Sequence, residues 1–161
     1  MRFFIKQQVM SLKDRFYVKD EDGRDRYFVE GEFLSFAKKL RIYDENNNEV
    51  VYIEQKLWNF LPEFDLFMNN EKVATVKKEW AFFRNNYSII GQDWHIEGSV
   101  TAHDYVIKKK NRVVADINKK WLSWEDAYEI NLYEEQDLEI LLGVVIVIDC
   151  VISAARANSS S

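Results

Sequence analysis

The sequence is poor in the residues that define several large protein classes. Its 161 residues include one cysteine, one proline, five glycines and two histidines. One cysteine excludes a disulfide framework and any zinc site built from several cysteines, and Cys150 in an apolar segment suits a reducing cytosol. Scarce proline and glycine exclude collagen-like and proline-rich linker classes. The N-terminal stretch lacks the apolar region and the cleavage site of a secretory signal, so we expect a cytoplasmic protein.

The chain also lacks an excess of positive charge. Its formal net charge is −5, which argues against general nucleic-acid binding. Residues 1–69 carry 11 basic and 13 acidic side chains, residues 70–121 carry 10 and 6, and residues 122–161 carry 1 and 8. The middle segment, at net +4, suits contact with an anionic surface. An ordinary solvated sheet face with mixed charges explains the same counts.

Apolar and aromatic residues are abundant. Hydrophobic residues make up 47% of the chain and aromatic residues 15%, so the sequence is that of a folded protein. The length corresponds to about one domain with a sizeable core. The aromatic content favours strands over helices.

A hairpin pattern recurs, and three of its copies end on a tryptophan. In each of these three, an asparagine lies ten residues before the tryptophan, a valine seven before it and a lysine two before it. An apolar strand, a polar turn and a returning strand predict a β-hairpin, and asparagine tolerates the positive φ of such turns. A fourth, degenerate copy has Asp22-Gly23 at its turn. The four copies are Ile42–Trp58, Phe64–Trp80, Asp104–Trp121 and, degenerate, Phe16–Phe33.

Further strand candidates fill the gaps between the hairpins. They are Arg2–Val9, Phe33–Phe36, Tyr87–Ile90, Trp94–Glu97 and Tyr128–Tyr133. The total is about twelve strands joined mostly by short turns, which predicts antiparallel pairing. We expect a meander that closes on itself or folds into a sandwich.

The segment Gln136–Ala155 is the most apolar part of the chain. It is too long for an ordinary strand, and a helix that is apolar on every side must be surrounded by protein or lipid. Lipid is disfavoured because the apolar run between Glu139 and Asp149 is nine residues, whereas a membrane span needs roughly 20. A barrel larger than eight strands leaves a lumen, and a helix of this length, about 30 Å, matches its axis.

These patterns together predict a mainly β fold. We expect a closed antiparallel barrel of about twelve strands around a buried, hydrophobic C-terminal helix. Residues 1–155 would form a single domain, and residues 156–161 a flexible polar tail.

Several short patterns resemble a known family. They are Tyr17-x-Val, Asp22-Gly23, Tyr27-x-Val-x-Gly31, Ile42-x-Asp44, Trp94-x-Ile96-x-Gly98 and Tyr105-x-Ile107, followed by the hydrophobic tail. Over residues 2–155 the chain resembles the LURP-one-related family of the tubby-like superfamily, which also includes the phospholipid scramblases. The resemblance implies a twelve-stranded barrel around a central C-terminal helix. Tubby itself binds membrane phosphoinositides through basic residues, whereas the calcium response of scramblases does not carry over because the chain has no D-x-D-x-D-G-x₅-E loop.

The basic middle segment supplies the candidate site. Lysines on neighbouring strands can bind phosphate head groups, each as a point charge. Alternation, however, sends adjacent lysines to opposite faces of a strand, and surface lysines also discourage sheet aggregation. The candidate lipid-binding residues are Lys77, Lys78, Lys108, Lys110, Arg112, Lys119 and Lys120.

The roles of three tryptophans and of one carboxyl group each have two interpretations. The tryptophans either form a membrane-interface belt or pack at the hairpin ends, and we expect packing. They are Trp58, Trp80 and Trp121. Asp149 in the core helix is either a functional group with a raised pKa or a residue near the barrel mouth that meets solvent or a basic partner, and we expect the second.

No catalytic pattern is present in the sequence. There is no G-x-S-x-G elbow and no glycine-rich phosphate loop, and no ligand cluster surrounds His95 or His103. We therefore expect a non-catalytic binding or scaffold module, monomeric, without cofactor or metal and without a transmembrane span. It would touch anionic phospholipid at the membrane periphery. The alternative is a protein–protein interaction module with no lipid role.

Overall fold

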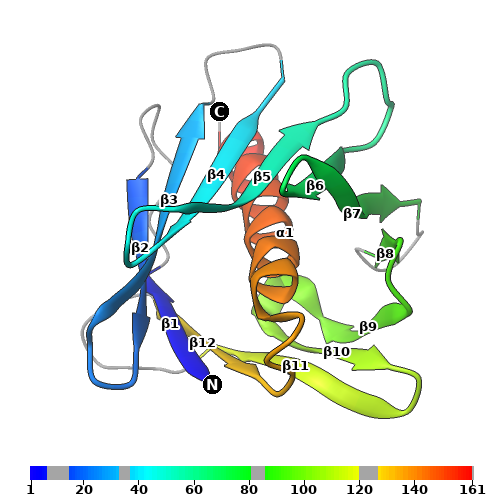
Figure 1. The fold of residues 1–161 in the computed structure, drawn as a ribbon. Helices are drawn as coiled ribbons and strands as arrows, with labels where there is room; N and C mark the ends of the chain where they lie inside the picture. Colours follow the sequence, from blue (N-terminus) through cyan, green and yellow to red (C-terminus); the bar gives the residue numbers. More distant parts are fainter. Residues whose placement is uncertain (7–14, 33–36, 81–85, 120–126, 161) are drawn as a thin grey trace.

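Twelve strands form one antiparallel sheet that curls around a single long helix (Figure 1). The structure, a computed structural model, describes residues 1–6, 15–32, 37–80, 86–119 and 127–160. The strands are β1 Arg2–Lys6, β2 Arg15–Asp20, β3 Asp25–Glu32, β4 Lys39–Asp44, β5 Glu49–Gln55, β6 Glu63–Met68, β7 Glu71–Glu79, β8 Asn86–Ile90, β9 Trp94–Ser99, β10 Asp104–Lys109, β11 Arg112–Asn118 and β12 Ala127–Leu132. A 3-10 turn, η1 (Val100–Ala102), precedes β10, and the helix α1 spans Leu138–Ser159.

The strand order makes a nearly closed barrel. Neighbours run β8-β7-β6-β5-β4-β3-β2-β1-β12-β11-β10-β9, so the first and last strands pair, with Phe3 opposite Ile130. Each pair is antiparallel, as the short connections predicted. The sheet ends at β8 and β9, which follow one another in the chain without pairing in the ladder. The predicted barrel fold is confirmed, with an open seam between these two strands.

The four predicted hairpins are present as β2–β3, β4–β5, β6–β7 and β10–β11. Positive φ falls on Gly23, Asn47 and Asn70, which suit the left-handed region. In the last hairpin it falls on Lys110 instead of the aligned asparagine. The predicted strand Phe33–Phe36 and the residue Trp121 lie outside the described residues.

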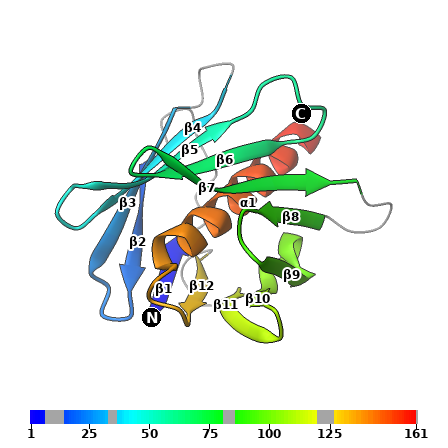
Figure 2. The ribbon, with the colours of Figure 1, turned by 45° about the vertical axis from the view of Figure 1, so that its right-hand side comes forward.

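Helix α1 fills the barrel, as Figure 2 shows along its length. Every side chain from Ile140 to Ile152 is buried, because the sheet surrounds the helix. The helix begins two residues later than expected and continues to Ser159, so residues 156–159 of the expected tail are helical. Within the described residues, α1 is the single helix long and apolar enough to cross a membrane. Its position inside the barrel makes it the core and not a transmembrane span.

One glycine sets how closely the helix approaches the sheet. A Cβ atom on Gly143 would lie 2.9 Å from Cδ2 of Leu66 and 3.5 Å from Cγ1 of Val51. These two residues belong to β6 and β5, and both are fully buried. The missing side chain therefore lets the helix backbone lie against these strands.

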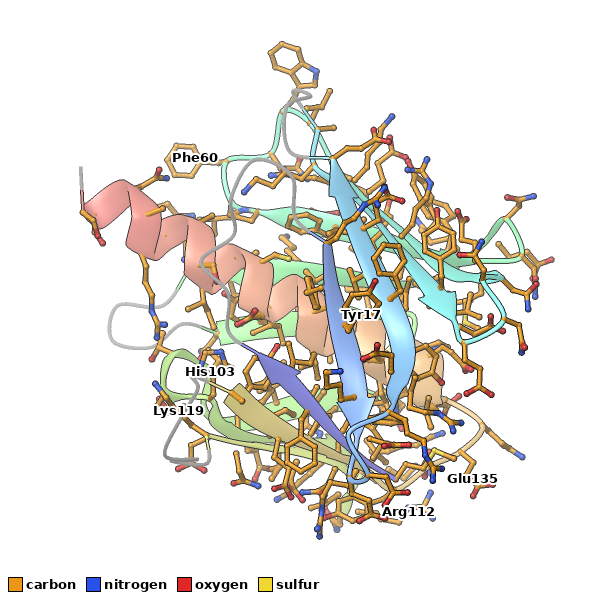
Figure 3. The ribbon with its side chains drawn as sticks, turned by 90° about the vertical axis from the view of Figure 1, so that its left-hand side faces the viewer. Tyr17, Phe60, His103, Arg112, Lys119 and Glu135 are labelled. Atoms are coloured by element: carbon orange, nitrogen blue, oxygen red, sulfur yellow. The ribbon has the colours of Figure 1, made fainter. Side chains whose placement is uncertain are left out.

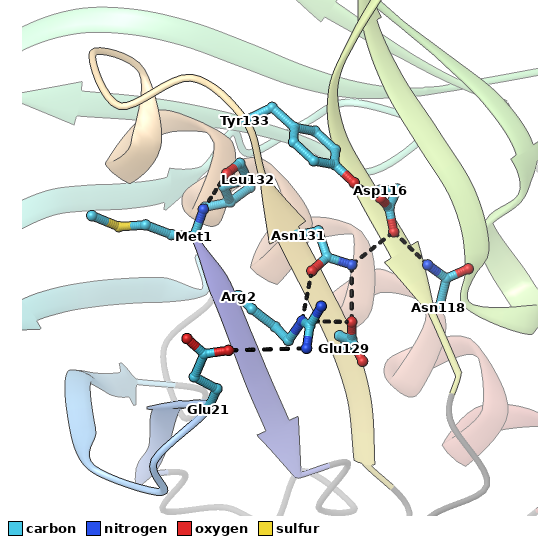
Figure 4. A network of polar contacts seen from close by, with 9 residues as sticks. All are labelled: Met1, Arg2, Glu21, Asp116, Asn118, Glu129, Asn131, Leu132 and Tyr133. Carbon is cyan, nitrogen blue, oxygen red and sulfur yellow. Dashed lines mark hydrogen bonds and ion pairs between the residues drawn. The ribbon is translucent and has the colours of Figure 1, made fainter.

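A polar network crosses the outer face where β1, β12 and β11 meet (Figure 4). Arg2 Nε lies 3.1 Å from Glu129 Oε1, and Asn131 Nδ2 donates to both Glu129 and Asp116 at 3.0 Å. The hydroxyl group of Tyr133 also donates to Asp116. These contacts link the first strand of the chain, β1, to its last two strands, β12 and β11, on the side of the sheet opposite the helix.

Candidate functional site

The barrel has two ends that differ in what surrounds them. The guanidinium of Arg156 donates to the carbonyl oxygen of Thr101 at 2.8 Å, so the end of α1 lies beside η1. At the other end, Lys109 Nζ lies 3.7 Å from a carboxylate oxygen of Asp137, just before the helix begins. We call these ends the C-terminal mouth and the N-terminal mouth. Because the strands alternate in direction, the β5–β6 connection and the end of β7 belong to the C-terminal mouth.

Part of the predicted basic site lies at the N-terminal mouth. There Lys108 Nζ lies 2.5 Å from Glu97, and Arg112 pairs with Glu134. The hydrogen bond from Lys108 lowers the pKa of Glu97, so this carboxylate stays charged. Lys110 occupies the turn between β10 and β11. Two of these three basic residues are thus already neutralised by acidic neighbours.

The other predicted lysines lie toward the C-terminal mouth. Lys77 and Lys78 are near the end of β7, where the backbone N–H of Lys78 donates to Pro62 O at 2.9 Å. Within the described part of the chain, neither lysine forms an ion pair. The backbone N–H of Lys119 donates to His103 O at 2.8 Å, and Lys120 lies outside the described residues. Those of the predicted basic residues that the structure describes therefore fall into two groups at opposite ends of the barrel.

Large aromatic side chains project from the C-terminal mouth. Trp58 is 99% exposed, Phe60 is 85% exposed and Trp80 is 76% exposed. Phe60 and Trp80 stack on one another, with ring centroids 5.5 Å apart and planes at 21°. Figure 3 shows Phe60 beside the end of α1. The expectation that Trp58 packs at a hairpin end is wrong, and Trp80 packs on a side chain that is itself exposed.

The backbone at Trp58 is strained. Its φ is 70°, in the left-handed region that bulky residues rarely adopt. Hydrogen bonds to Glu63 hold the loop on both sides, from Lys56 Nζ at 2.7 Å and from Asn59 Nδ2 at 2.9 Å. The first of these bonds raises the pKa of Lys56. Strain of this kind persists where the surrounding structure imposes it, and it is common at functional sites.

A buried polar pair lies deeper in the barrel. His103 ends η1 in the left-handed region, with φ 51°, and is 2% exposed. Its Nε2 atom lies 2.8 Å from Oδ1 of Asp149 on α1, and its ring stacks on Tyr128 at 4.6 Å. His103 is thus the basic partner predicted for Asp149. Burial, and next the charge of Asp149, raise the pKa values of Tyr105 and Tyr128 well above 10.

This pair has the character of a structural contact. No nucleophilic side chain bonds to His103, whose Nδ1 atom has no hydrogen-bond partner in the described structure. Among the described residues, no group of three metal-ligating side chains comes together. The sequence signal for the pair was Asp149 alone, a carboxyl group in an apolar segment, and nothing near His103 in the sequence shows that it is the partner.

The fold and these surfaces can be compared with known proteins. The family model described as LURP-one-related matches residues 1–149. The chain belongs to the LURP-one-related family. A LURP-one-related relative, the uncharacterized protein YxjI of Bacillus subtilis (strain 168), is 32% identical over 152 residues, which cover 94% of each chain. An X-ray structure of a protein from Arabidopsis thaliana matches 93% of this chain and 91% of its own, with a TM-score of 0.62 and 16% identity. That likeness is one of fold, the tubby-like barrel.

Proposed function

We propose that this LURP-one-related protein is a non-catalytic binding module that docks reversibly on an anionic phospholipid surface. Its C-terminal mouth would face the membrane. Trp58, Phe60 and Trp80 would enter the interfacial layer, while Lys77 and Lys78 would meet the head groups. The observation that carries the proposal is the exposure of three large aromatic rings, 76% or more, at one end of the barrel.

The chemistry of these side chains suits a bilayer interface. Tryptophan has an apolar body and a polar N–H, and it is enriched at membrane–water boundaries for that reason. Burying an aromatic ring is worth about 1.5–3 kcal/mol, and a lysine near an anionic surface about 1 kcal/mol. A few such contributions give weak, reversible attachment, which suits a peripheral protein.

The form of the surface favours lipid over a protein partner. Trp58 and Phe60 lie in the β5–β6 loop, Trp80 directly follows β7, and Trp58 is almost wholly solvated. A rigid partner would need a pocket shaped for each projecting ring, whereas a fluid interface accommodates them without one. The fixed backbone at Trp58 also removes part of the ordering cost of insertion.

Vesicle cosedimentation tests the proposal. The full chain is mixed with phosphatidylcholine vesicles, with and without phosphatidylglycerol, at low and high salt. We expect the anionic vesicles to sediment the protein, with salt weakening the binding. Trp58→Asn and the double variant Lys77→Gln/Lys78→Gln should each bind less. Tyr17→Asn, at an exposed aromatic residue on β2, is the matched control and should bind as the wild type does.

Two results would contradict the proposal. The first is no sedimentation at low salt on any anionic vesicle. The second is equal binding by the wild type and the Trp58 variant, because the aromatic loop would then play no part. In the first case the protein–protein interaction module becomes the better hypothesis for the same loop.

A further inference from the structure

The seam of the barrel lies between β8 and β9. The Cα ladder of β8 runs along β7, from Thr75 opposite Ile90 to Glu79 opposite Asn86. The ladder of β9 runs along β10. Residues 91–93 join the two strands, which lie close together but form no ladder with one another (Figures 1 and 2).

Among the described residues, no strand pairs with the outer edge of β8 or with that of β9. In an antiparallel ladder, alternate residues of an edge strand direct N–H and C=O groups away from the partner strand. Apart from their own ladders, the described residues of β8 and β9 make no backbone hydrogen bond. A row of such donors and acceptors is complementary to the backbone of an extended polypeptide.

The edge of β8, a strand of five residues, lacks two of the features that usually block strand addition, charge and proline. Its sequence, NYSII, contains no charged residue and no proline. Ile90 at its end is 54% exposed. By contrast, β9 carries Glu97, which is paired with Lys108. Charged side chains and proline are the common protection of natural sheet edges, so β8 is the more receptive of the two strands.

The inner and outer faces of β8 and β9 indicate which side chains an added strand would carry. Tyr87 and Ile89 on β8 point into the core, and Ile96 on β9 packs partly against it. On the outer face, Ser88 and Ile90 alternate with these inward residues. An added strand would therefore place every second side chain against the apolar interior and the others in solvent.

We propose that the β8 edge is a β-addition site for an extended segment of a partner protein. The segment adds antiparallel to β8 and carries apolar residues at every second position. This site is separate from the aromatic loop and does not depend on membrane binding. Its occupation extends the sheet across the seam.

The probe is a set of synthetic peptides selected from a phage-displayed random library on the immobilised full chain. We expect the selected sequences to show apolar residues at alternate positions. Two N-methylated forms of each peptide are compared, one methylated at the backbone nitrogens that face β8 and one at the nitrogens that face away. The first should bind roughly tenfold or more weakly than the unmethylated peptide, and the second should bind nearly as well. A difference between the two methylated forms distinguishes strand addition from side-chain docking, since methylation leaves the side chains unchanged. The selected peptide should also slow hydrogen exchange in Asn86–Ile90.

Ile90→Lys is the matching change on the protein. It adds a charge at an exposed edge position, so the fold should persist while peptide binding falls by about tenfold. Tyr17→Lys, at a half-exposed position on the internal strand β2, should leave peptide binding unchanged. Vesicle binding by Ile90→Lys should stay at the wild-type level. A loss of peptide binding can therefore be distinguished from a loss of the proposed membrane binding.

Three outcomes would overturn the inference. One is a library from which no binding peptide is selected. Another is a peptide affinity that falls equally in both N-methylated forms, or a slowing of hydrogen exchange at residues 57–60 in place of β8. The third is a dimer of the chain whose exchange protection falls on β8, since the edge would then belong to a second copy.

Discussion

Nε2 of His103 lies 2.8 Å from Oδ1 of Asp149, and this contact joins the η1 turn to the core helix across 46 positions of the chain. Both residues are buried, at 2% and 9% exposure. A polar atom left without a partner in such a place costs free energy. The pair therefore fixes the position of α1 within the barrel in a way that apolar contacts alone do not.

Removing the carboxylate of Asp149 should be costly. We expect Asp149→Ala to lower the free energy of unfolding by about 3 kcal/mol, because His103 Nε2 is left buried and unpaired. Asp149→Asn retains an acceptor and should cost less. Urea unfolding monitored by tryptophan fluorescence measures both. An unchanged unfolding midpoint for the alanine variant would show that the pair does not stabilise the fold.

The buried tyrosines should make the protein sensitive to alkali. Burial raises the pKa of Tyr87 to about 12, and the pKa values of Tyr105 and Tyr128 lie well above the unfolded-state value of 10. Unfolding therefore releases protons above pH 10. Stability is complete below pH 10 and falls as the pH rises toward the folded-state values, by about 1.4 kcal/mol per pH unit for each tyrosine.

Thermal unfolding at pH values on either side of 10 measures this slope. Tyr128→Phe is the comparison variant, because it removes one of the tyrosines whose pKa burial raises well above 10. This variant should lose stability less steeply above pH 10 than the wild type does. A slope equal to that of the wild type would contradict the assignment.

Because the backbone at Trp58 is strained, a mutation there should stabilise the protein, whereas most mutations lower the free energy of unfolding. Trp58→Gly should raise the free energy of unfolding by about 1 kcal/mol, because glycine adopts positive φ without cost and the indole ring is solvated. The same variant should bind anionic vesicles less. Trp80→Gly, at a residue without positive φ, should bring no such gain. Differential scanning calorimetry makes the comparison, and a destabilised Trp58→Gly would show that this backbone is not strained.

The helix should tolerate a charge outside the barrel and reject one inside it. Val145 is 1% exposed, whereas Ala157 on the same helix is exposed. Val145→Asp should abolish folding because it buries an unpaired carboxylate. Ala157→Asp should change stability by less than about 0.5 kcal/mol. Circular dichroism and thermal melts distinguish the two, and a folded Val145→Asp would mean that α1 is not the core.

The sequence predicted the barrel because local and long-range signals agreed. Asparagine or Asp-Gly turns between apolar runs specified the hairpins, and a helix apolar on every side required a surrounding sheet. The end of α1 was missed because Ser153–Ser159 lacks the apolar pattern, although its alanines favour helix and its exposed position needs no apolar face. The seam was missed because strand counting does not show whether the two outermost strands pair.

The binding surface was less predictable than the fold. The partners of Lys108 and Arg112 come from β9 and from the segment before α1, and nothing local in the sequence brings these acids to the basic hairpin. Trp58 and Trp80 end two similar repeats, so the pattern suggested one common role in packing. Their exposure depends on the path of the β5–β6 loop and on one unusual backbone angle, which a residue pattern does not encode.

The helix that fills the barrel follows every strand in the chain, and β1, which pairs with β2, has its second neighbour only when β12 has been made. On the ribosome, the hairpins emerge first and have nothing to enclose. The nascent sheet can mature only when α1 has left the exit tunnel, so folding of this protein is completed after translation of its last strand. Until then the apolar inner face of the sheet lacks the helix that covers it, and an uncovered apolar surface of this kind is prone to aggregation.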